Sequence, residues 1–210
     1  MSPAQEHIIA TALDLLDELG LEGLTMRKLA QALKIQVPSL YWHFKNKEAL
    51  LEAVADTLLA SVAQQPITLD EEWSTQLMAV ATDIRQALLR RRDGARFLAT
   101  TYPISENGAR VTTYMIQLLK NAGADEQTAT WSVIAMISYV IGFTIEEQSL
   151  SNKNLSKKQH GDALQAIFHK YPMGNAIIQQ IQANNMDEWF DFGLRLPIDT
   201  LSLRLSKTQA

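Results

Sequence analysis

The sequence contains no cysteine among its 210 residues, and this absence excludes several kinds of chemistry. Disulfides, cysteine nucleophiles and thiolate-bound metal sites are all ruled out, so the chain needs no oxidising compartment. The first residues also lack a basic start followed by an apolar run, so we expect no secretory signal and a cytoplasmic protein. The formal net charge is −4, so the chain as a whole does not have the basic character that indicates nucleic-acid binding.

Motifs typical of catalysis are missing as well. The four histidines have no metal-ligand spacing, and the sequence has neither a glycine-rich phosphate loop nor a nucleophile elbow. Glu146 and Glu147 are neighbours on a predicted helix and point apart, which excludes an acid/base pair. We therefore expect no enzymatic activity, no cofactor and no metal site.

Residues 128–145 carry no charge over 18 positions, which is the lower limit for crossing a bilayer. Acidic residues flank this segment at both ends, and no Lys or Arg lies close enough to give a positive-inside bias. We therefore expect a helix buried in protein and no membrane partner.

The pattern of apolar residues predicts an all-α fold, because alternation with a period of two is scarce and helix-start signals recur. We predict a three-helix helix-turn-helix domain in residues 1–46 and a larger helical domain in residues 47–210. We predict helices at residues 3–19, 25–33, 37–43, 107–121 and 156–170, and a connecting helix at 47–63. We also predict a helix that starts with a capping box at residues 68–71, a long helix after Asp125 and a last helix capped by Asn185.

Two short helices, 25–33 and 37–43, are separated by the three residues Lys34, Ile35 and Gln36. That spacing is typical of a helix-turn-helix, whose second helix is offered to the major groove of DNA. The charges support this interpretation, because residues 27–47 contain five basic and no acidic side chains, whereas residues 1–26 contain five acidic side chains and no Lys or Arg. A phosphate backbone responds to the local field, since screening limits its reach to about 10 Å.

The motif Pro38-Ser39-Leu40-Tyr41-Trp42-His43-Phe44-Lys45-Asn46-Lys47, together with Gly20, Gly23-Leu24-Thr25 and Arg27-Lys28-Leu29-Ala30, resembles the DNA-binding segment of the TetR family of repressors. The resemblance implies that DNA is contacted by Thr25, Arg27, Val37, Pro38, Ser39, Tyr41, Trp42, His43 and Lys47. Arg27 would read a base edge, that of guanine, and the polar residues would mostly hold phosphates.

Two positions depart from the family pattern. Val37 replaces a polar base-reading residue and can touch a thymine methyl group without hydrogen-bonding a base, so the operator should differ there. Lys34 occupies a turn position that often carries glycine, and a left-handed backbone at lysine would cost on the order of 1 kcal/mol.

The remainder of the chain is similar, more weakly, to the effector domain of the tetracycline-repressor type, through residues 88–96, Thr101, Pro103, Gly142 and 146–148. The resemblance implies an effector pocket lined by Val80, Ile84, Leu98, Thr101, Tyr102, Tyr114 and Glu146. Leu98 takes the place of a histidine that ligates drug-bound magnesium, so a largely apolar effector is expected. The alternative is that these positions are simply core residues.

A homodimer is expected on two grounds. Trp131, Ala135, Ser138 and Gly142 share one helical face that a second chain would cover, and a palindromic operator needs two recognition helices. The sequence thus predicts a dimeric repressor that a small effector releases from a double-stranded DNA operator. An activator, and a helical interaction protein that has lost DNA binding, remain open as alternatives.

Overall fold

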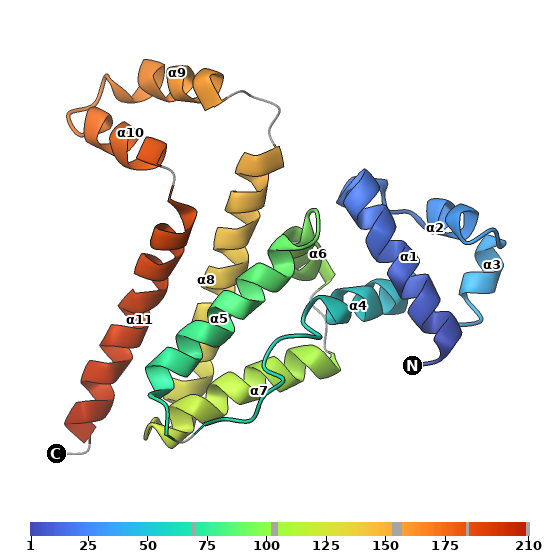
Figure 1. Ribbon diagram of the computed structural model, residues 1–210, viewed down its shortest axis with the longest axis horizontal. Coiled ribbons are helices and arrows are strands. Elements are labelled where there is room, and N and C mark those ends of the chain that lie inside the picture. Colours follow the sequence, from blue (N-terminus) through green and yellow to red (C-terminus); the bar gives the residue numbers. More distant parts are fainter. Residues whose placement is uncertain (69, 102–104, 153–156, 184, 209–210) are drawn as a thin grey trace.

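The computed structural model describes residues 1–210 except 69, 102–104, 153–156, 184 and 209–210. All of the regular secondary structure in these described residues is helical, which confirms the predicted fold class (Figure 1). The elements are α1 (Pro3–Leu19), the 3₁₀ turn η1 (Leu21–Gly23), α2 (Met26–Ala32), α3 (Val37–Leu40), α4 (Lys47–Leu58), α5 (Trp73–Leu89), α6 (Gly94–Thr101), α7 (Glu106–Asn121), α8 (Glu126–Asn152), α9 (Lys157–Phe168), α10 (Gly174–Ala183) and α11 (Met186–Thr208).

The N-terminal head consists of α1, α2 and α3, with the start of α4 packed against α1 (Figure 1). Side-chain caps define where its helices begin, because Thr25 accepts the N–H of Lys28 and Asn46 accepts the N–H of Ala49. Leu16, Leu29, Leu40 and Leu50 are buried at the centre, one from each helix. A small domain with this core holds α2 and α3 in a fixed relation.

Lys34 follows α2 and has a φ of 56°, so the turn of the helix-turn-helix uses the left-handed backbone that sequence analysis considered. The predicted helix 37–43 is too long, since α3 ends at Leu40 and the chain continues as a turn. Phe44 explains this difference, because its ring is buried in the head and a longer helix would turn it away.

The predicted connecting helix 47–63 is also too long. α4 ends at Leu58, a turn follows, and Ala63 has a φ of 50°. The carbonyl groups freed at this end are bound by Arg110 of α7, which removes the need for a further helical turn. A contact from a residue far along the chain therefore decides where the helix stops.

The body is built around α5 and α8, with α6 and α7 packed against both. α5 begins at Trp73 and lacks a side-chain cap, so the expected capping box at 68–71 does not form among the described residues. Gln76 explains the later start, because its amide group exchanges hydrogen bonds with the backbone of Thr68 and donates to the Glu71 carbonyl. These bonds tie the incoming chain to the side of α5.

The last three helices complete the chain. Sequence analysis missed α10, which packs on α9 to form a helical hairpin beyond the ends of α8 and α11 (Figure 1). α11 returns along α8 and α5, with Phe190, Leu194, Ile198 and Leu201 buried. α8 and α11 therefore lie side by side on one flank of the body.

Candidate nucleic-acid interface and effector domain

The predicted DNA-contacting residues lie around α2, α3 and the start of α4. Two of them, Val37 and Ser39, are half-buried, and the others are exposed: Thr25, Arg27, Pro38, Tyr41, Trp42, His43 and Lys47. Trp42 is 87% exposed and Tyr41 47% exposed. Large aromatic side chains left this open to water are typical of a surface that binds a partner.

Gln5 of α1 positions this surface, and sequence analysis did not identify it. The Gln5 side-chain amide donates a hydrogen bond of 2.9 Å to the carbonyl of His43, while its oxygen accepts the N–H of Ser2 at the start of α1. The turn that carries Tyr41 and Trp42 is thereby tied to the first helix. No local sequence pattern marks the contact, because the two residues are 38 positions apart.

The acidic side of the head is bound by the body. Arg91 forms an ion pair of 2.5 Å with Asp17 of α1, and Arg96 forms one with Glu22 at 2.5 Å. Arg92 donates its backbone N–H to Asp17 and its guanidinium to the Glu18 carbonyl. Arg91 and Arg92 therefore join the two parts of the molecule.

The predicted effector-pocket residues fall into three groups in the structure. Val80, Ile84 and Leu98 are buried in the core between α5 and α6. Thr101 and Tyr114 are half-buried, and the Thr101 hydroxyl donates to the carbonyl groups of its own helix. Burial raises the pKa of Tyr114, with a further contribution from Glu71. Glu146 is exposed, and Tyr102 lies outside the described residues.

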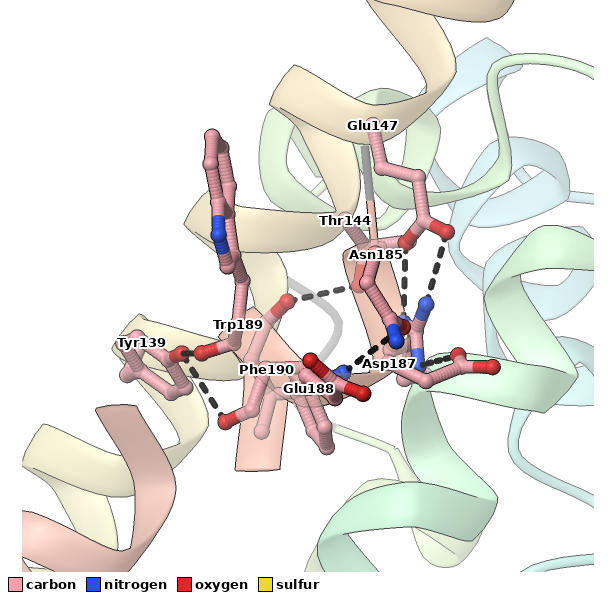
Figure 2. Close-up of polar contacts among 10 residues, drawn as sticks. Tyr139, Thr144, Glu147, Asn185, Asp187, Glu188, Trp189 and Phe190 are labelled. Carbon is pink, nitrogen blue, oxygen red and sulfur yellow. Dashed lines mark hydrogen bonds and ion pairs between the residues drawn. The ribbon is translucent and has the colours of Figure 1, made fainter. Parts of the chain in front are cut away.

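Glu147, the neighbour of Glu146, is the acidic residue that faces the core. It accepts two hydrogen bonds from the guanidinium of Arg85, at 2.8 and 2.7 Å, and Asp187 accepts a third at 2.7 Å. Arg85 is only 2% exposed, and its guanidinium carbon lies 4.9 Å from the centre of the Phe190 ring. Figure 2 shows Glu147 of α8 and Asp187 of α11 converging on this point.

The hydrogen bonds that Arg85 donates to Glu147 raise the pKa of Arg85 more than burial lowers it, so the guanidinium is charged in the core. This cluster of Arg85, Glu147 and Asp187 joins α5, α8 and α11. Sequence analysis missed it, because a single arginine beside an apolar stripe is ordinarily exposed. The acidic partners of Arg85 are evident only in the folded chain, where α5, α8 and α11 lie together.

Tyr139 makes a second connection between α8 and α11. Its hydroxyl donates to the Phe190 carbonyl at 3.0 Å and to that of Trp189 at 3.2 Å. Figure 2 shows both contacts. Burial raises the pKa of Tyr139, so the hydroxyl remains a hydrogen-bond donor. Gly193 of α11 leaves room for it, since a Cβ atom there would lie 2.2 Å from the Tyr139 oxygen.

The predicted dimer face is exposed in the single chain. Trp131 is 65% exposed, and Ala135, Ser138 and Gly142 are exposed on the same side of α8. α11 adds exposed Phe192, Leu196 and Leu203.

By length and composition, residues 126–150 of α8 suffice to cross a membrane, and 28% of their most apolar 18-residue window is buried in the chain. In a single chain α8 is therefore covered on one side only, and its burial by a second chain stays a prediction.

Comparison with known proteins identifies two matching family models. Residues 8–54 match the model of bacterial regulatory proteins, tetR family, and residues 65–205 match the tetracyclin repressor-like, C-terminal domain. The chain is 35% identical to the tetracycline repressor protein class A from transposon 1721 of Escherichia coli, over 94% of this chain and 89% of that protein.

Two solved structures share the whole fold. ActR from Streptomyces coelicolor, in complex with actinorhodin, superposes with a TM-score of 0.85 at 27% identity, covering 98% of this chain and 99% of ActR. BioQ with its natural double-stranded DNA operator superposes with a TM-score of 0.69 at 26% identity, covering 95% of this chain and 98% of BioQ. The likeness therefore extends across both the head and the body.

Proposed function

The chain belongs to the TetR family of bacterial DNA-binding regulators, and from this premise we propose that it is a dimeric repressor. It binds a palindromic operator through the head and leaves the operator when a small, largely apolar effector enters the body. The observation that carries the proposal is that residues 27–47 expose five basic side chains and no acidic one, together with the exposed rings of Tyr41 and Trp42. Such a protein acts in the cytoplasm, where it meets the chromosome.

The roles of the individual side chains follow from their chemistry and exposure. Arg27 lies exposed in the first turn of α2 and presents a planar fork that matches the O6 and N7 acceptors of guanine. Lys47 and the backbone N–H groups at the start of α4 suit a phosphate. Val37, half-buried at the start of α3, offers only methyl groups to the groove.

The proposed dimer uses the apolar faces of α8 and α11. Gly142 supports this arrangement, because a Cβ atom there would meet nothing within 4 Å in its own chain. The small residue is thus unnecessary for packing within one subunit, whereas close approach of a second helix would need it. Trp131 and Phe192 are large apolar side chains that such a contact would cover.

The proposed effector differs from a metal-bound tetracycline, although a tetracycline repressor is among the relatives. Val80, Ile84 and Leu98 present only hydrocarbon from the core of the body, and leucine cannot ligate a metal ion. Among the described residues, no group of three or more His, Asp or Glu side chains is placed to hold a metal. An apolar molecule that displaces core contacts between α5 and α6 suits these side chains better.

The test is selection of DNA from a random-sequence pool by the purified protein. We expect enrichment of a palindrome with half-sites about 34–36 Å apart. Affinity for it should fall by about 10³-fold or more between 50 and 200 mM salt, because several phosphates are contacted. Tetracycline with Mg²⁺ should not release the selected DNA. A pool without enrichment would overturn the proposed repressor, and release by tetracycline with Mg²⁺ would overturn the apolar effector.

A further inference from the structure

The end of α4 and the start of α7 cap each other. The Asp56 carboxylate of α4 accepts the backbone N–H of Asn107 at 2.9 Å and that of Gly108 at 3.4 Å. It also accepts the Asn107 side-chain amide at 2.8 Å. A negative charge is thereby placed at the N-terminus of α7, where the helix dipole favours it.

Arg110 makes the reverse contact, from α7 to the end of α4. Its guanidinium donates to the carbonyls of Leu59 at 3.1 Å and Ala63 at 3.0 Å, and also to that of Val62. These carbonyls lie in the turn that follows α4, where that of Leu59 also accepts the Val62 N–H, and a positive charge at the C-terminus of a helix is favourable. Arg110 also donates to the Asn107 side-chain oxygen at 2.8 Å. We call Asp56, Asn107 and Arg110 the α4–α7 clamp.

The clamp lies on the route between the body and the DNA-binding head. α4 begins at Lys47, in the proposed DNA-binding surface, and ends at the clamp. α7 begins at the clamp and continues through Met115 and Leu119, which are buried in the core of the body. The first turn of α7 and the far end of α4 are therefore bound to each other at the clamp.

Asn107 makes the two halves of the clamp interdependent, because it binds both Asp56 and Arg110. Displacement of this residue removes partners from both charged side chains at once. Through this shared partner, a change at either half of the clamp reaches the other, and coupling between distant sites requires such contiguous contacts.

We infer that the α4–α7 clamp transmits the state of the body to the head, so that α7 and not α4 alone communicates between effector and operator. The inference rests on the proposed repressor function and adds the regulation of its DNA-binding surface. By reciprocity, DNA bound to the head must alter the stability of the clamp and of the first turn of α7.

The experiment measures amide hydrogen exchange of the full-length protein with and without the DNA selected from the random pool. In the wild-type protein, DNA should change exchange in residues 59–63 and 106–111 by about threefold or more. Asp56→Asn, and Arg110→Lys as a second variant that retains the charge, should bind the same DNA and lose this change in 106–111. Glu52→Gln, which removes an exposed carboxylate from the same helix, is the matched control and should retain it.

The readout separates transmission from a merely structural role. A clamp that only stabilises the fold would speed exchange in both states of Asp56→Asn and leave the DNA-dependent change intact, which would overturn the inference. Bound DNA with no response in α7 of the wild-type protein would also overturn it. If no DNA is enriched, the proposed function fails first, and that result is distinct from DNA that binds without a response in α7.

Discussion

Arg91 and Asp17 join the body to the head, with 2.5 Å between Nη1 of the arginine and Oδ2 of the aspartate. The other carboxylate oxygen of Asp17 accepts the backbone N–H of Arg92 at 2.9 Å. The chain turns next to this pair at Gly20, whose φ of 71° favours glycine and whose Cβ position lies only 2.8 Å from Asp93. The head is therefore held at a close, charged interface on this side and by the α4–α7 clamp on the other.

Asp17→Asn should weaken this interface while leaving the head folded. The side chains of Arg91 and Asp17 are 33% and 38% exposed to solvent, so the free energy of unfolding should fall by less than about 1 kcal/mol. The loss should be larger at low salt than at high salt, because the interaction is screened. Urea denaturation at two salt concentrations measures it, with Asp14→Asn on an exposed position of α1 as the control. Equal losses in both variants would show that Asp17 contributes nothing specific.

Lys34→Gly should stabilise the protein, because the left-handed backbone at this position is strained for lysine. The expected gain in the free energy of unfolding is at most about 1 kcal/mol. Lys34→Ala removes the same charge and retains the strain, so it is the matched control. Thermal unfolding of the three proteins gives the answer, and a glycine variant no more stable than the alanine variant contradicts the prediction.

Arg27→Ala and Lys47→Ala should have different effects on DNA binding. Loss of a base-reading arginine should cost about 1–3 kcal/mol on the selected operator and relax the preference at particular base pairs. Loss of a phosphate contact should weaken all sequences alike and make the salt dependence less steep. Binding to the operator and to its single-base variants distinguishes them. If Arg27→Ala lowers the affinity for all sequences equally, Arg27 contacts a phosphate and does not read a base.

Arg85→Ala should strongly destabilise the body. It leaves Glu147 and Asp187 without the guanidinium, and removing one member of a buried ion pair typically costs about 3–5 kcal/mol. Asp187→Asn should cost much less, because its side chain is 80% exposed and retains a polar group. Chemical denaturation of both variants tests the ranking, and similar losses would contradict the view that burial at Arg85 decides the energy.

Two glycines in the flanking helices should respond oppositely to alanine. Gly193→Ala places a Cβ against the Tyr139 hydroxyl and should lower the free energy of unfolding by about 1–3 kcal/mol. Combining it with Tyr139→Phe should restore part of this stability. Gly142→Ala meets nothing in its own chain, so it should weaken dimerisation while gaining helix propensity. Denaturation and analytical ultracentrifugation separate the two effects. If Gly142→Ala dimerises as strongly as the wild-type protein, the dimer interface does not include Gly142.

The local signals in the sequence predicted the head well. Thr25 and Asn46 cap α2 and α4, and Asp125 caps α8 in the body, and such caps can be read from the sequence because the hydrogen bond joins residues only three positions apart. The apolar pattern likewise predicted α1, and the uncharged run of residues 128–145 predicted most of α8. These features depend on neighbours in the chain, which a single sequence displays directly.

Features that depend on distant partners were not predictable in the same way. The end of α4 depends on Arg110, and the charge on Arg85 is accommodated by Glu147 and Asp187, 62 and 102 positions away. The ion pairs of Arg91 and Arg96 were not predictable for the same reason, since their acidic partners Asp17 and Glu22 lie in the head. Opposite charge runs in two segments were visible in the sequence, but nothing in either segment indicated that they meet.

The basic surface of the head has a consequence for how the protein reaches DNA. The chain is negative overall while residues 27–47 are positive, and the head lies at one end of the molecule (Figure 1). The protein is therefore an electric dipole, attracted to a phosphate backbone by one end and repelled by the other. An approaching molecule is rotated before contact, so productive collisions exceed those expected of random orientation. The net negative charge, which argues against nucleic-acid binding when the chain is treated as a whole, thus helps to orient the head toward DNA before contact.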